Sequence, residues 1–250
     1  MTPAPHPGGA RPVADVTGRA RALWEILAGV PVTFSPEVSV AVSPGSRLCP
    51  PGWTGFVTIG DGGIATVPVP GLREPVRRAL RGHPPAGLPD VSGLRAVLPV
   101  RDVLGPAQLA YLDEAGFRPW PGTRAVARLS PNDTGLRRLL AGSDEADARE
   151  SGVGEITSPA FAISEGGDVV SVCGYRRWPT GVAQLCVLTA AAARGRGLAR
   201  TVASAAVAHA LSEGRLPQWR ARLPQSRRVA AALGFRELGT QLSLHLQPGP

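Results

Sequence analysis

The sequence contains no lysine, so all 27 of its basic residues are arginines. A P-loop of the GxxxxGK[ST] type requires a lysine, and its absence excludes that class of nucleotide site. With 19 acidic residues, the net charge is +8. The arginines are dispersed and come without the stacking aromatic residues of a nucleic-acid-binding surface, so we expect no nucleic-acid partner. A basic mouth for an anionic cofactor accounts for the same charge.

Cysteines, aromatic residues and long apolar runs are also scarce. Three cysteines form no disulfide framework. Cys173 and Cys186 would lie nearly opposite each other around a turn at Pro179–Thr180, and we interpret them as small buried side chains in a reducing compartment. No run approaches the roughly 18 apolar residues of a membrane span, and Met1–Pro12 lacks the apolar segment of a signal peptide. We therefore expect a cytoplasmic protein without a membrane partner.

Glycine and proline are abundant, with 31 and 26 residues, and they divide the chain into short elements. Residues 1–12 are predicted to be a disordered tail, and residues 13–120 a mixed α/β region. Gly60–Gly63 between two apolar runs predicts a β-hairpin. This region contains no motif that indicates a chemistry. The other expected elements are helices over Thr17–Val30, Leu72–Arg81 and Pro106–Ala115 and strands over Val38–Val42 and Leu94–Val100.

A clearer alternation of strands and helices follows Pro119–Thr123, which we interpret as the boundary of a second unit, residues 124–250. An acidic connector is expected over Ser143–Gly152. The sequence as a whole predicts an α/β fold with a mixed sheet. The expected strands are Arg124–Leu129, Phe161–Ser164, Val169–Tyr175, Ala183–Thr189, Gln218–Arg222 and Phe235–Leu246, and the expected helices are Asp133–Ala141, Gly197–Glu213 and Ser226–Leu233.

The most informative segment is an apolar strand that ends in the turn Arg194–Ala199, from which a helix begins at Gly197. The first N–H groups of a helix have no partner inside it, and together with the helix dipole they bind phosphate. Arg194 and Arg196 add positive charge beside the turn. The three-glycine dinucleotide fingerprint does not match here. The segment therefore predicts a phosphate-binding turn, although an exposed strand–helix connection is the alternative.

The sequence Arg194-Gly-Arg-Gly-Leu-Ala199 is similar to the Q/R-x-x-G-x-G/A signature of the GNAT (general N-acetyltransferase) superfamily. Leu233-Gly-Phe235 and Leu216–Trp219 resemble later parts of that fold. The resemblance implies a GNAT fold in the C-terminal half, preceded by a smaller mixed α/β region, with acetyl-CoA as the co-substrate. Two alternatives stay open for residues 13–120: they supply the first strands and helices of one large fold, or they form a separate GNAT-like unit that shapes the substrate pocket. The residues that it assigns to acetyl-CoA are Val187, Leu188 and Thr189 beside the pantetheine arm and Gly195, Arg196, Gly197, Leu198 and Ala199 at the pyrophosphate, with Arg194 adjacent.

Ser226 matches a serine that is common in this superfamily, and it either contacts CoA or caps its helix. Many members place a glutamate on the fourth strand and a tyrosine on the late helix. The corresponding positions here are Gln184 and Ala230. Three alternatives stay open: Gln184 positions a water chain that carries the proton, Glu155 is the general base, or the domain binds acyl-CoA without transferring it.

Tyr175 and Trp178 flank the side where family substrates bind, and they are either walls of a substrate pocket or ordinary packing residues. His209 is another possible base, but its place on the predicted helix favours packing. We predict an N-acetyltransferase that moves an acetyl group from acetyl-CoA to the amine of a small molecule or peptide. The alternative is a degenerate GNAT domain that binds acyl-CoA or a partner. Monomer and homodimer both stay open, and no metal site is expected.

Overall fold

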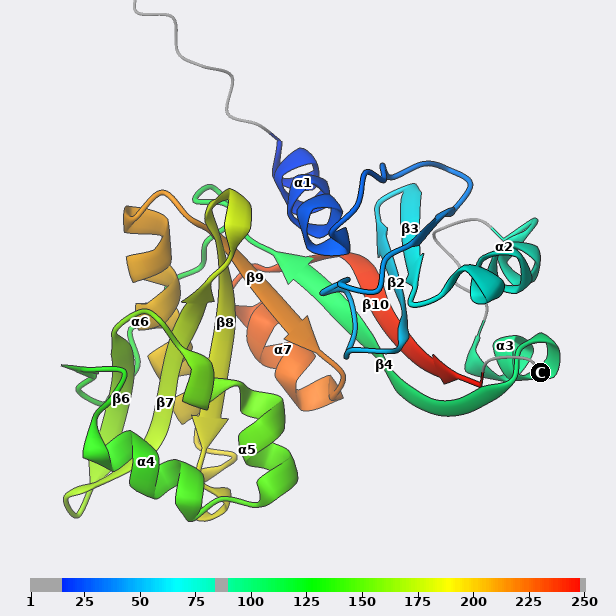
Figure 1. Ribbon diagram of the computed structural model, residues 1–250. Coiled ribbons are helices and arrows are strands. Elements are labelled where there is room, and N and C mark those ends of the chain that lie inside the picture. Colours follow the sequence, from blue (N-terminus) through cyan, green and yellow to red (C-terminus); the bar gives the residue numbers. More distant parts are fainter. Residues whose placement is uncertain (1–14, 84–89, 248–250) are drawn as a thin grey trace, which may run out of the picture.

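A single sheet runs through the computed structural model, which describes residues 15–83 and 90–247 (Figure 1). Its ten strands follow the order β1-β3-β2-β10-β4-β9-β8-β7-β6-β5. Helices pack against both faces of this sheet, and the α/β class predicted from the sequence is confirmed. The predicted tail at residues 1–12 lies outside the described residues.

The N-terminal part of the sheet begins with β1 (Ser39–Val42), β2 (Thr54–Ile59) and β3 (Gly62–Val67). Strands β2 and β3 form the predicted antiparallel hairpin, and β1 runs parallel to β3. Helix α1 (Val16–Ala28) packs on one face against Val57 and Ile59, whereas α2 (Arg73–Leu80) packs on the other. The period-2 alternation of strand side chains therefore supplies two separate cores in this part of the chain.

Two predictions in this part are wrong. Leu94–Val100 is not a strand, because α3 (Val91–Val97) occupies its first half. The N-cap of α3 is Asp90, whose side chain accepts a hydrogen bond from the Gly93 N–H. Pro106–Ala115 is not a helix, because β4 (Val100–Tyr111) extends through most of it. Residues 109–111 are buried on both faces between β10 and β9, and this pairing overrides the helix propensity of Ala, Gln and Leu.

The C-terminal half contains β5 (Ala127–Leu129), β6 (Ala160–Glu165), β7 (Asp168–Arg177) and β8 (Val182–Thr189), which pair antiparallel in sequence order. Strand β9 (Leu216–Ala221) is parallel to β8, and β10 (Arg236–Leu246) ends the described fold. Side chains of α4 (Thr134–Ala141) lie on one face, and those of α6 (Leu198–Ser212) and α7 (Pro224–Ala232) on the other.

The expected acidic connector Ser143–Gly152 is also wrong, because it contains helix α5 (Glu145–Ser151). Asp144 caps this helix by accepting from the N–H groups of Ala146 and Asp147. Acidic residues in the first turn interact favourably with the helix dipole, and Gly152 ends the helix in a left-handed conformation.

The register of β7 and β8 places Cys173 opposite Val187 and Cys186 opposite Gly174. The predicted pairing is therefore off by one residue, which directs the two thiols to opposite faces of the sheet. Both cysteines are free and buried, as the packing interpretation expected.

The two halves of the chain share the sheet, because β4 lies between β9 and β10. Gln108–Tyr111 pairs with Gln218–Ala221 on one edge, and β10 pairs with β4 along most of the other. Strand β10 in turn pairs with β2. The segment Pro119–Thr123 lies between β4 and β5, and the division there into an N-terminal region and a GNAT domain stays a prediction.

Gly234, just after α7, packs closely against the backbone of the segment that follows β4. Its φ is 98°, and a Cβ atom there would overlap the backbone oxygen of Gly116. We expect Gly234→Ala to lower the free energy of unfolding by roughly 2–4 kcal/mol through strain plus this clash. Gly214→Ala is the matched control, since Gly214 has a φ of 67° with open space around it. Urea denaturation should show the larger loss for Gly234→Ala, and equal losses would contradict the proposed clash.

Candidate functional site

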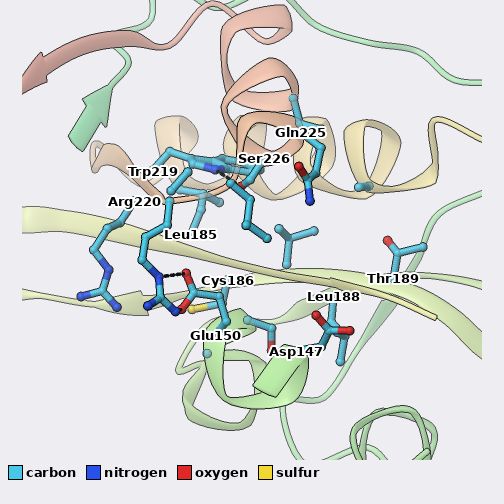
Figure 2. Close-up of a pocket in the computed structure, with 18 of the residues that line it drawn as sticks. Asp147, Glu150, Leu185, Cys186, Leu188, Thr189, Trp219, Arg220, Gln225 and Ser226 are labelled. Atoms are coloured by element: carbon cyan, nitrogen blue, oxygen red, sulfur yellow. Dashed lines mark hydrogen bonds and ion pairs between the residues drawn. The ribbon is translucent and has the colours of Figure 1, made fainter. Parts of the chain in front are cut away.

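A cavity of about 600 Å³ lies where β8 and β9 stop pairing (Figure 2). Their parallel ladder joins Val182–Gln184 to Leu216–Gln218. Beyond it, β8 continues along β7 while β9 follows β4. Within the described chain, no strand pairs with the β9-facing edge of residues 185–189, so backbone groups there can bind a ligand in an extended conformation.

The predicted phosphate turn forms one end of this cavity, with Gly195, Gly197, Leu198 and Ala199 in its lining. Gly195 and Gly197 both have a φ of 76°, a left-handed conformation that favours glycine. No side chain caps α6 in the described structure, and its first turn holds no acidic residue. The first amides of this 15-residue helix therefore lack an intrahelical partner at a positive dipole end, an arrangement that suits an anion.

The two arginines of the turn have different places. Arg194 lines the cavity, and its Nη2 donates to Asp147 of α5 at 2.6 Å. Arg196 lies outside the described lining and donates twice to Glu165, at 2.6 and 2.9 Å. This hydrogen bonding and charge hold the pKa of Glu165 below its ordinary value. The side chain of Arg196 thus ties the turn to β6, while Arg194 supplies charge at the cavity.

The edge of β8 supplies Val187, Leu188 and Thr189 to the lining, as the resemblance implied. Ser226 also lines the cavity, and its Oγ is 3.0 Å from the Trp219 Nε1 that donates to it. Ser226 does not cap α7, whose N-cap is Leu223. Figure 2 shows Trp219, Gln225 and Ser226 on one side of β8, and Glu150 and Cys186 on the other. The cavity therefore reaches both faces of the sheet.

Glu155, Gln184 and Trp178 all line this cavity. Glu155 ends the short 3-10 helix η3 (Val153–Glu155), and its carboxylate accepts a hydrogen bond from Arg176 Nη1. Gln184 is buried, and its Oε1 accepts from Gln218 Nε2 at 2.7 Å. The structure thus brings the two candidate catalytic residues into one cavity, beside the point where β8 and β9 separate.

Tyr175 lies elsewhere, because it precedes Arg176 on β7 and therefore faces α6. Its side chain is fully buried outside the described cavity lining, and its hydroxyl is 2.9 Å from His209 Nδ1. His209 also packs against the Phe161 ring. The structure places Tyr175 in the core contact between α6 and the sheet, and His209, which is partly buried, at the edge of that contact.

Sequence reasoning missed several charged residues of the cavity. Asp147 and Glu150 come from α5, and the missed signal was Asp144, a helix-capping residue before an acidic first turn. Arg222 donates from Nε to Glu150 at 3.0 Å. Six arginines and three carboxylates line the cavity, so its charge favours an anionic ligand. The missed charged residues of the lining are Asp147, Arg149, Glu150, Arg176, Arg200, Arg220 and Arg222.

Over the described ranges 15–83 and 90–247, no cluster of three or more His, Cys, Asp or Glu residues could hold a metal ion. In the same ranges, no helix combines the length and the apolar character that crossing a membrane requires.

Residues 151–240 match the family model of the GNAT acetyltransferases. This match identifies a GNAT domain in the C-terminal half and confirms the resemblance seen in the sequence. None of the curated proteins matches the chain.

Three solved structures that are similar to this chain have the following identities and coverages. A GCN5-related N-acetyltransferase from Kribbella flavida is 17% identical with a TM-score of 0.48, and the match covers 66% of this chain and 65% of that one. An acetyltransferase from the GNAT family from Colwellia psychrerythraea is 15% identical with a TM-score of 0.45, and the match covers 60% of this chain and 59% of that one. A GCN5-related N-acetyltransferase-like protein from Streptococcus suis is 21% identical with a TM-score of 0.44, and the match covers 58% of this chain and 62% of that one. The chain thus spans less than two thirds of each of these proteins.

The partly buried position of His209 makes a prediction about pH. Burial lowers its pKa below the ordinary 6.5, with Glu213 opposing the shift. A histidine with a depressed pKa in the folded state contributes stability above pH 6.5 that is lost as the pH falls below this value. We therefore expect the Tm to fall more steeply for the wild type than for His209→Gln between pH of about 7.5 and 5.5. Parallel Tm curves in a thermal melt would contradict this assignment.

Proposed function

We propose that this chain, whose C-terminal half carries a GNAT domain, transfers an acetyl group from acetyl-CoA to an amine. The observation that carries this proposal is the continuity between the turn at the start of α6 and the unpaired edge of β8 inside one cavity. An anion site at one end and an extended backbone edge leading away from it match the two ends of a phosphopantetheine arm. The three free cysteines suit the cytoplasmic location that the sequence predicts.

In this proposal, the amides from Gly195 to Ala199 bind the pyrophosphate of acetyl-CoA, and Arg194 and Arg200 add positive charge beside it. Arg200 lies in the first turn of α6 and stacks its guanidinium 3.8 Å from the Trp120 ring centroid. The pantetheine arm pairs with the free edge of residues 187–189. The thioester then lies near Gln184, where β8 and β9 begin to diverge.

The acceptor approaches from the α5 side, where Glu155 and Gln184 line the cavity. Glu155 accepts a proton from the ammonium group, directly or through water, and the neutral amine attacks the thioester carbonyl carbon. A C–N bond forms and the C–S bond breaks. The nitrogen then loses its second proton, which passes through water to the CoA thiolate. Backbone N–H groups on the free edge of β8 can polarise the carbonyl during this step.

The cofactor assignment is tested at Gly197. Replacing it by glutamate puts a carboxylate and a strained residue at the proposed anion site, so Gly197→Glu should weaken acetyl-CoA binding at least about a hundredfold in calorimetry. Gly52→Glu is the matched control, because Gly52 also has a positive φ, 80°, with open space around it. Gly52→Glu should bind as the wild type does. Unchanged affinity in Gly197→Glu would refute the assigned turn.

The role of Glu155 is tested against Glu150, the other glutamate in the cavity lining. Removing a general base typically lowers turnover by 10²–10⁴-fold, so we expect Glu155→Gln to lower kcat by about that range. Glu150→Gln removes an equal charge but not the proposed base, and its kcat should fall less than tenfold. CoA thiol release with an active amine measures both. Equal effects of the two variants would favour proton transfer through water positioned by Gln184.

A degenerate GNAT domain that binds acyl-CoA, or a partner, is the second candidate function. Gln184 and Ala230 support it, because these positions hold a glutamate and a tyrosine in many members of the superfamily. Calorimetric binding of acetyl-CoA without thiol release across a broad panel of amines would favour this binding module over the enzyme.

A further inference from the structure

The α5 side of the cavity holds an arginine whose charge is not neutralised by a neighbouring carboxylate. Arg176 is paired with Glu155 and Arg222 with Glu150. Arg220 of β9 has no acidic group within salt-bridge distance among the described residues, and the hydrogen bond from its Nη1 goes to the Gln241 side-chain oxygen at 3.2 Å. A neutral amide cannot balance the charge of a guanidinium.

The groups around Arg220 act on its charge in opposite directions. Desolvation by the cavity walls lowers the pKa of Arg220, and the charges of Arg222 and Arg176 lower it further, while Glu150 opposes them. Cys186 faces the same group, but burial raises the pKa of its thiol to about 12, so it is neutral and supplies no counter-charge. The side chain of Arg220 is exposed at the open cavity, so its guanidinium can contact a ligand, and the charges of Arg222 and Arg176 beside it favour an anionic one.

The position of Arg220 separates it from the proposed pyrophosphate site. Gln218 is the last β9 residue that pairs with β8, and Arg220 comes two residues later on the same face of the strand. The intervening Trp219 faces the opposite way, into the core with α6 and α7. Figure 2 shows Arg220 at the end of the cavity away from Thr189, which precedes the phosphate turn. Arg220 therefore lies on the α5 side of the cavity, near Glu150 and Arg176, which is the side from which the acceptor is proposed to approach.

We infer that Arg220 binds a carboxylate of the acceptor, so that the substrate is an amine that also carries a carboxylate group. This inference rests on the proposed acetyl transfer. A guanidinium presents paired N–H donors that match the two oxygens of a carboxylate. Glu155 and Arg220 line the same cavity, so an amino-acid-like substrate has a partner for each of its two charges: Glu155 for the ammonium group and Arg220 for the carboxylate.

The experiment compares standard amino acids with their carboxamides as acceptors, using thiol release from acetyl-CoA. We expect kcat/KM of the wild type to favour the acids at least about tenfold, and Arg220→Gln to reduce this ratio to about one. Arg220→Lys keeps the charge without the paired donors and should give an intermediate ratio. Arg149→Gln is the control, since Arg149 lines the cavity but pairs with Glu145 on the exposed surface of α5. The ratio of kcat/KM between acids and carboxamides should be the same in Arg149→Gln as in the wild type.

A binding measurement keeps the inference testable without turnover. N-acetyl amino acids and their amides are titrated calorimetrically into the CoA-saturated protein, and the acids should bind at least about tenfold tighter in the wild type only. Rapid acetylation of amides and acids alike, or a preference that survives Arg220→Gln, would overturn the inference and leave acetyl transfer standing. Arg220-dependent binding of the acids without turnover of any amine would instead refute the proposed function.

Succinyl-CoA distinguishes the acceptor from the acyl group as the source of the carboxylate. If Arg220→Gln weakens succinyl-CoA binding, leaves acetyl-CoA binding unchanged and does not alter the preference between acids and amides, Arg220 recognises the acyl chain. That outcome would overturn the assignment to the acceptor.

Discussion

The cavity depends on the position of β9, which is held by different neighbours along its two edges. Its first residues pair with β8, and its last residues pair with β4, a strand from the N-terminal part of the chain. Since β4 lies between β9 and β10, it fixes the course of β9 beyond Gln218 and keeps it from following β8. The free edge of β8, the place of Arg220 and the opening to both faces of the sheet all follow from this arrangement.

This arrangement also connects the N-terminal region indirectly to the site, through β4. Gln241, which accepts the hydrogen bond from Arg220, lies on β10 next to β4 and β2. A change that shifts β4 would therefore move both the wall of the cavity and the side chain that orients Arg220. Gly234, packed against the backbone after β4, connects the end of α7 to the same contact. All of the described lining residues belong to the C-terminal half, and the N-terminal region touches the site only through the pairing of β4 with β9.

The sequence predicted the parts of the fold that depend on local signals. The β2–β3 hairpin, the turn before α6 and most C-terminal elements follow from glycine positions and apolar periodicity. The strand predicted over Leu94–Val100 was wrong because the capping aspartate Asp90 was overlooked. The helix predicted over Pro106–Ala115 was wrong because long-range pairing converts this Ala- and Leu-rich segment into β4. The residues of the candidate site also fall into two groups, those that a local motif reveals and those that only the fold brings together. A contiguous motif reveals Arg194–Ala199, but the convergence of Glu150, Arg222 and Arg220 depends on how α5 and β9 meet, which no local pattern encodes.

The glutamine at position 184 is consistent with the charges around it. Gln184 lies directly opposite Arg176 in the β7–β8 register, and Arg176 already pairs with Glu155. A glutamate at 184 would compete with Glu155 for that guanidinium and would add a further negative charge to the α5 side of the cavity. A neutral amide leaves the pair intact and accepts from Gln218 instead. If Glu155 is the base, its carboxylate replaces the strand glutamate of other members, and the pairing with Arg176 holds it at the cavity wall.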